Sequence, residues 1–89
     1  MDDDTKTEGG EGEVAELTFG QKAVGITFNP GGNPEVNDIK KLYAEIIDSL
    51  NNFRSVTESG EVNRLCSIAI TEAQTAQMWA VKAITWQVE

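Results

Sequence analysis

The fold is decided by residues 61–86, EVNRLCSIAITEAQTAQMWAVKAITW, in which alanine returns every three or four positions. Steps of this size place a row of alanines along one side of a helix, as in a heptad seam. Because alanine has no side chain beyond Cβ, a partner helix can approach to the close end of the usual range of about 8–10 Å. The alanines are Ala69, Ala73, Ala76, Ala80 and Ala83, and bulkier apolar residues flank them: Leu65, Ile68, Met78, Trp79 and Trp86.

The apolar positions of this segment cover more than half of its circumference, so we expect a long helix with more than one buried face. A row of alanines buries little apolar area, and at about 25 cal/mol per Å² a single helical hairpin held by it would be marginally stable. The pattern therefore favours an obligate oligomer of helical hairpins. The alternative is one intramolecular seam, with the tryptophans covering a small core.

A short helix is predicted near the start of the ordered part of the chain. Thr18 and Gln21 have the spacing of a capping box, and Gly25 is a typical helix terminator, so the helix should cover residues 19–24. The next residues, 26–34, contain two prolines and two glycines and should form a tight loop rather than regular structure.

A long helix should follow this loop, because Asn33 is a typical N-cap and Pro34 suits the first helical position. We expect it to cover residues 34–53. The last helix would then start at Ser55 or at Ser59, and the short connection makes the two long helices antiparallel neighbours. The apolar row of the second helix has heptad spacing and consists of Val36, Ile39, Tyr43, Ile46, Leu50 and Phe53, widened by Leu42 and Ile47.

Composition argues against an enzyme. The 89 residues make one domain, they include no histidine, and the single cysteine, Cys66, lies in the apolar pattern of the last helix as a core residue. Disulfides, zinc fingers and cysteine–histidine catalysis are therefore excluded, and we expect no metal and no cofactor. The carboxylates of the long helix have spacings typical of solvated faces, and no base or metal cluster accompanies them: Glu35, Asp38, Glu45 and Asp48.

The charge is unevenly distributed. The formal net charge is -8. Residues 1–17 carry a net charge of -6, and the remaining chain carries a net charge of only -2. We therefore predict an acidic flexible tail at residues 1–16 and a helical-hairpin domain at residues 17–89. An acidic mimic of DNA would depend on the tail alone, so no DNA partner is expected. We also expect no membrane span, no signal peptide and a cytoplasmic location.

A binding surface is better supported than a catalytic one. Phe28 and Asn29 precede the loop glycines, and Lys40 and Lys41 lie two turns into the long helix. Together with backbone amides around Gly31 and Gly32, they would offer a stacking plane, amide donors and positive charge to an anion that carries bases. The alternative is that the lysines are solvated and the phenylalanine covers a core.

Three stretches resemble the small bacteriophage anti-CBASS proteins, the family of cyclic-oligonucleotide sponges. These are LTFGQKAVGITFNP at residues 17–30, VNDIKKL at residues 36–42, and residues 64–86. The most specific parts are AITEA at residues 69–73 and AQMWAVKA at residues 76–83.

The resemblance implies an all-α hexamer of helical hairpins, with a short N-terminal helix before two long antiparallel ones. Relatives bind cyclic dinucleotides such as 3′,3′-cGAMP between protomers, and some bind cyclic trinucleotides on the threefold axis. They sequester the second messenger in the cytoplasm of the infected bacterial host without cleaving it, and so keep CBASS effectors from being activated.

By position, the resemblance implies that Phe28 stacks on a base and that Lys40 meets a phosphate. The loop differs in length from that of the relatives, so Phe19 and Lys41 remain alternatives to these two residues. A cyclic-trinucleotide site would use Arg64 and Thr71, which is a looser assignment.

A rival interpretation is an acidic helical adaptor or structural oligomer that binds a protein partner through the faces of Trp79 and Trp86.

Overall fold

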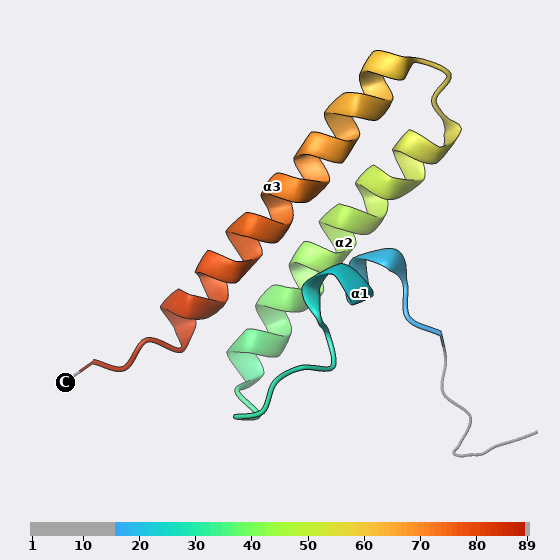
Figure 1. Cartoon of the computed structure of the whole chain (residues 1–89). Coiled ribbons are helices and arrows are strands. Elements are labelled where there is room, and N and C mark those ends of the chain that lie inside the picture. Colours follow the sequence, from blue (N-terminus) through green and yellow to red (C-terminus); the bar gives the residue numbers. More distant parts are fainter. Residues whose placement is uncertain (1–15, 89) are drawn as a thin grey trace, which may run out of the picture.

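The computed structural model describes residues 16–88, and within this range the chain consists of three α-helices and no strand. A short helix, α1 (Phe19–Val24), precedes two long antiparallel helices, α2 (Pro34–Val56) and α3 (Gly60–Ile84), as Figure 1 shows. The predicted all-α hairpin with a short preceding helix is thereby confirmed. Apart from Glu16, the tail predicted at residues 1–16 lies outside the described residues.

Capping side chains start all three helices. At α1 the hydroxyl of Thr18 accepts from the Gln21 backbone N–H at 3.0 Å, and the Gln21 side chain accepts from the Thr18 backbone N–H at 2.9 Å, which completes the predicted capping box. Asn33 caps α2 by accepting from the Glu35 N–H at 2.8 Å. Ser59 caps α3, which decides between the two starts that the sequence left open.

The predicted end of α2 was wrong by three residues, because the helix continues from Phe53 to Val56. Ser55 therefore lies inside α2, where its hydroxyl donates to the carbonyl of Asn52 at 2.7 Å. Such a bond to a carbonyl within the same helix satisfies a serine hydroxyl without ending the helix. The helix ends at Val56, because the extended backbone of Thr57 prevents another turn.

The core lies where the three helices meet. Its buried residues are Val24, Ala44, Ile47 and Ile70, and the side chain of Ile47 is 0% exposed. Partly buried residues pack around them: Ala23, Ile26, Tyr43, Leu50 and Ala73. Cys66 is buried in α3, as the sequence predicted.

The alanine row of α3 is only partly used within the chain. Ala73 packs against the core, whereas Ala76 and Ala83 are exposed. The row that faces α2 instead contains Cys66, Ile70 and Gln77, because these larger side chains fill the space between the helices better than alanine does. The alanine row is therefore not the intramolecular seam of the alternative interpretation, and its use between protomers stays a prediction.

On α2 the buried face likewise differs from the apolar row that the sequence predicted. Val36 and Ile47 are buried, but Ile46 and Phe53 are exposed.

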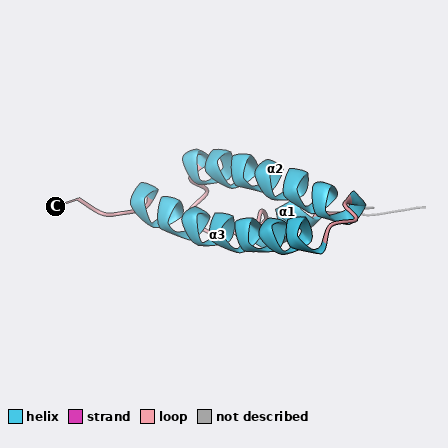
Figure 2. Cartoon of the chain, turned by 90° about the horizontal axis from the view of Figure 1, so that it is seen from above, coloured by secondary structure: helices cyan, strands magenta, loops and turns pink. Residues whose placement is uncertain are grey.

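Besides the core packing of Val24, a close backbone approach holds α1 against α2. The Gly20 N–H donates to the Asp48 carboxylate at 2.6 Å, and the absence of a side chain on Gly20 lets the backbone of α1 approach Ala44. Asp48 is thus half-buried and bound to the backbone, which corrects its assignment to a solvated face. The resulting molecule is flat, with Cα extents of 49 × 43 × 12 Å, and Figure 2 shows it edge on.

Among residues 16–88, none of the three helices has a hydrophobic stretch of the length and composition that a membrane span requires.

Candidate ligand-binding site

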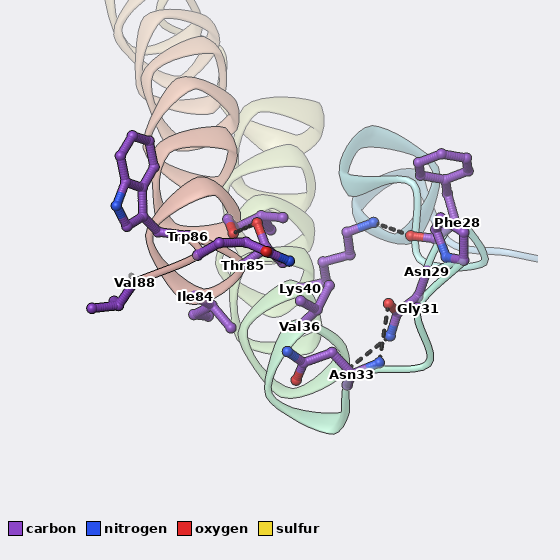
Figure 3. Close-up of a pocket in the computed structure, with 13 residues that line it drawn as sticks. Phe28, Asn29, Gly31, Asn33, Val36, Lys40, Ile84, Thr85, Trp86 and Val88 are labelled. Carbon is purple, nitrogen blue, oxygen red and sulfur yellow. Dashed lines mark hydrogen bonds between the residues drawn. The ribbon is translucent and has the colours of Figure 1, made fainter.

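A cavity of about 620 Å³ opens between the loop that joins α1 to α2 and the C-terminal end of α3. Its size lies within the range of about 300–1,000 Å³ that is usual for small-molecule sites. Figure 3 shows the loop on one side and the end of α3 on the other, with α2 between them. The loop and α2 contribute Phe28, Asn29, Pro30, Gly31, Asn33, Val36 and Lys40, and the end of α3 contributes Val81, Ile84, Thr85, Trp86, Gln87 and Val88.

The loop consists of short turns that its glycines make possible. The Phe28 N–H donates to the Gly25 carbonyl at 2.9 Å, and the Gly32 N–H donates to the Asn29 carbonyl at 3.0 Å. Gly25 and Gly32 have φ values of 64° and 65°, a left-handed conformation in which a Cβ would be strained. The loop therefore bends twice and brings Phe28 to the mouth of the cavity.

Asn29 braces this loop against the start of α2. Its side-chain amide nitrogen donates to the Asn33 carbonyl at 2.8 Å and to the Asn37 side-chain oxygen at 3.1 Å. Its side-chain oxygen accepts from the Asn33 backbone N–H at 3.3 Å. Both donors of the Asn29 amide are thus used within the protein, so this residue lines the cavity without offering a free donor to a ligand.

Lys40 crosses from α2 to the same loop. Its Nζ donates to the carbonyls of Gly25 and Phe28 at 2.9 and 2.5 Å, and it lies 5.6 Å from the centroid of the Phe28 ring. The side chain is only 5% exposed. Two of the three ammonium donors are therefore directed to loop carbonyls, and Figure 3 shows the chain of Lys40 extended toward the loop.

The ring of Phe28 is the most exposed aromatic ring that lines the cavity. It is 70% exposed although the backbone beneath it is held by hydrogen bonds. An exposed aromatic ring on a fixed backbone provides a plane on which a base can stack.

The structure brings Phe28, Asn29 and Lys40 together but places the two alternatives elsewhere. Phe19 lies at the start of α1, where the Arg54 guanidinium is 5.4 Å from its ring centroid. Lys41 is exposed among Asp38, Leu42 and Glu45 on another face of α2. Neither residue lines the cavity that contains Phe28.

Arg64 and Thr71 are exposed on α3 and are two helical turns apart. Arg64 already has an acidic partner, since its Nη2 and Nε lie 2.6 and 3.1 Å from the two carboxylate oxygens of Glu61. The hydrogen bonds from Arg64 hold the pKa of Glu61 below its ordinary value, and those same bonds raise the pKa of Arg64. An anion that binds Arg64 would have to displace this carboxylate.

Sequence reasoning missed the wall formed by the end of α3. Ile84, Thr85 and Val88 line the cavity, although no sequence pattern predicted a role for them. The signal was present in the topology, because an antiparallel hairpin places the end of one helix beside the start of the other. Trp86 belongs to the same wall, but Figure 3 shows its indole directed away from Phe28, and the Nζ of Lys82 lies 5.8 Å from its ring centroid.

Comparison with known proteins gives one match. The family model described as the Acb2/Tad1 hairpin domain matches residues 21–85, which is more than half of the chain and includes the loop and both long helices. None of the curated proteins and none of the solved structures compared with the chain matches it.

Proposed function

The chain belongs to the Acb2/Tad1 hairpin family, the anti-CBASS cyclic-oligonucleotide sponges, and we propose from this premise that it sequesters cyclic dinucleotides such as 3′,3′-cGAMP. Binding in the cytoplasm of the infected bacterial host would lower the free concentration of the messenger and so block activation of CBASS effectors. One observation supports the site in particular: the exposed ring of Phe28 is held at the mouth of a cavity large enough for a nucleotide.

Storage without cleavage is part of the proposal. The chain has no histidine, and its only thiol, Cys66, is buried away from the cavity. Within residues 16–88 no group of three acidic, cysteine or histidine side chains is placed to hold a metal ion. Phosphodiester hydrolysis needs a positioned base, nucleophile or metal, so the proposed role is that of a binder.

Calorimetric titration with 3′,3′-cGAMP tests the binding. Replacing Phe28 by alanine should weaken it by about 1–3 kcal/mol for each stacked base, which is about 5- to 150-fold. Phe19→Ala is the matched comparison, because it removes a phenylalanine ring that is also exposed, at 43% against 70% for Phe28, but that lies outside the cavity, and it should leave the affinity unchanged. The reverse result would move the site to Phe19. Recovery of intact ligand after the complex is heated would separate storage from hydrolysis.

Self-association is proposed because the isolated chain leaves so much apolar surface uncovered. Twelve large apolar side chains are exposed within the described range, among them Ile46 and Phe53 on α2 and Ile68 and Trp79 on α3. Apolar surface on this scale usually marks an interface in a protein that is stable in solution. We take the assembly to be the homohexamer implied by the family resemblance, with each dinucleotide pocket completed by a second protomer.

The close packing of alanines can be tested separately from the fold. Ala76 is exposed in the chain, so leucine at this position has room within the protomer. At a tight interface the same change should overpack the contact at a cost of about 1–3 kcal/mol per copy. Native mass spectrometry of Ala76→Leu should therefore show a smaller assembly while circular dichroism shows normal helix content, and an unchanged assembly mass would remove this row from the interface.

A separate cyclic-trinucleotide site is proposed at Arg64 and Thr71. The supporting feature is a guanidinium and a hydroxyl that are exposed two turns apart on one helix. Arg64→Ala should abolish binding of a cyclic trinucleotide and leave binding of the dinucleotide intact. Equal loss of both ligands would show that Arg64 acts on the assembly instead.

The exposed indoles of Trp79 and Trp86 favour one rival function, an adaptor or structural oligomer that binds a protein. This rival predicts neither heat nor thermal stabilisation on addition of a cyclic dinucleotide. A mimic of DNA would need the acidic residues 1–16, so deleting them separates that function from a sponge, which should keep its affinity.

A further inference from the structure

Lys40 is the one charged side chain that is buried among residues 16–88. Lysine is almost never fully buried without partners, because the ammonium loses its hydration. A phosphate contact on an open surface would not require this burial. The position of Lys40 therefore calls for a role within the protein.

That role follows from the atoms that surround the ammonium. Nζ bonds to the carbonyls of Gly25 and Phe28, which flank the first turn of the loop, and the Phe28 ring lies within cation–π distance. Both carbonyls belong to the backbone that carries Phe28. If Nζ turned to a phosphate, the part-buried Phe28 carbonyl would lose this donor and the Gly25 carbonyl would keep only its bond from the Phe28 N–H, which is unfavourable.

We propose that Lys40 is a positioning residue: it holds the loop backbone at residues 25–28 on α2 and thereby presents the Phe28 ring to the ligand, in place of binding a phosphate directly. This inference rests on the proposed nucleotide site for its functional meaning. Its structural part concerns the protein without ligand. Asn29 supports the same loop one residue further on, through its bonds to Asn33 and Asn37.

The unmodified protein without ligand provides the first test. Lysine ammonium protons that are hydrogen-bonded and shielded exchange slowly with water, whereas those of solvated lysines exchange too fast to observe. Nitrogen-detected NMR at neutral pH should therefore resolve the ammonium of Lys40 and not that of the exposed Lys41. A Lys40 ammonium that exchanges as fast as that of Lys41 would overturn the proposal.

Loop dynamics provide the second test. In Lys40→Met, amide hydrogen exchange at residues 26–33 should accelerate about tenfold or more, because the turns lose their anchor to α2. Lys41→Met removes the same charge one residue away and should leave these amides unchanged, which controls for the altered net charge. Equal exchange in both variants would refute the positioning role.

A double-mutant cycle with 3′,3′-cGAMP links the loop to binding. If Lys40 acts through Phe28, then Lys40→Met should weaken binding in the wild-type background but cause less than a twofold further loss in Phe28→Ala. A phosphate ligand would instead cause the same loss in both backgrounds. If the wild type does not bind the dinucleotide, the proposed function fails, while a protected ammonium and a loosened loop would still identify Lys40 as the anchor of the loop.

Discussion

Replacing Gly20 by alanine should separate α1 from α2, and the structure allows the cost to be worked out. An added Cβ would overlap the carbonyl oxygen of Ala44 and lie 2.9 Å from both the Ala44 carbonyl carbon and the Asp48 Cγ. Two of these atoms are backbone and cannot rotate away. Overpacking costs about 1–3 kcal/mol, and losing the bond from the Gly20 N–H to a carboxylate costs about 1.5–3 kcal/mol more.

Against this cost stands a gain of up to about 1 kcal/mol, because alanine favours a helix more than glycine does. The net loss should be about 1.5–6 kcal/mol, a large share of the stability of about 5–15 kcal/mol that is typical of a domain. Urea denaturation followed by far-UV circular dichroism, at one fixed protein concentration, measures the free energy of unfolding directly.

Gly60 offers a matched control at the start of α3. A Cβ at that position meets nothing within 4 Å, so Gly60→Ala should be neutral or stabilise by up to about 1 kcal/mol. If the Gly20→Ala variant has the same free energy of unfolding as the wild type, the close approach of α1 to α2 is refuted. Equal destabilisation by both substitutions would show a general intolerance of alanine rather than a steric conflict at Gly20.

Two further substitutions probe the caps and the exposed ion pair. Asn33→Ala removes the N-cap of α2 and should lower the free energy of unfolding by about 1 kcal/mol in urea denaturation, and no change would place the helix start elsewhere. Arg64→Ala should raise the pKa of Glu61 toward its ordinary value in an NMR titration, because the pKa-lowering hydrogen bonds are lost. In the wild type the contribution of Glu61 to stability is present above its unfolded-state pKa and is lost as pH falls through the lowered folded-state pKa. A Glu61 pKa that is the same in both proteins would contradict the pairing.

Local signals in the sequence predicted the helices well because each signal acts within a few residues. Thr18 with Gln21, and Asn33 with Pro34, fixed two helix starts correctly, since a cap depends only on its own turn. The end of α2 was less predictable. Ser55 fits a cap or a helix interior equally well, and only the contacts of the finished hairpin decide between them.

The buried faces were harder to predict because both long helices are apolar around more than one face. Periodicity shows which residues share a side of a helix, but it does not show which side meets the intramolecular partner. On α3 the alanines gave the clearest pattern, yet Cys66 and Ile70 face α2 while Ala76 is exposed. The sequence thus contained more than one apolar pattern on each long helix, and the contact between α2 and α3 buries only part of them.

The candidate site was predicted in composition but not in the hydrogen bonds that its residues make within the protein. Phe28, Asn29 and Lys40 do lie together, as the loop chemistry suggested. A sequence cannot show that an asparagine amide or a lysine ammonium already bonds to other groups of the protein, because those partners are set by the path of the loop. Polar residues of this kind look the same in a sequence whether they bind a ligand or the protein itself.

One polar stripe of α2 accounts for the shape of the site. Asn37, Lys40, Ala44 and Asp48 follow one another at steps of three or four and so share one side of the helix. Three of them hydrogen-bond to the segment that precedes α2: Asn37 to Asn29, Lys40 to the first loop turn, and Asp48 to α1. Ala44 is small enough to admit the α1 backbone.

This stripe therefore holds the N-terminal helix and the loop in one arrangement before any ligand arrives. Ordering a loop during binding costs free energy, and a loop that is ordered in advance avoids that cost. The exposed Phe28 ring can then contribute most of its stacking energy to affinity. For this reason, substitutions at Lys40 or Asp48 that touch no ligand should still weaken binding, whereas an exposed charge outside the stripe, such as that of Lys41, should be replaceable.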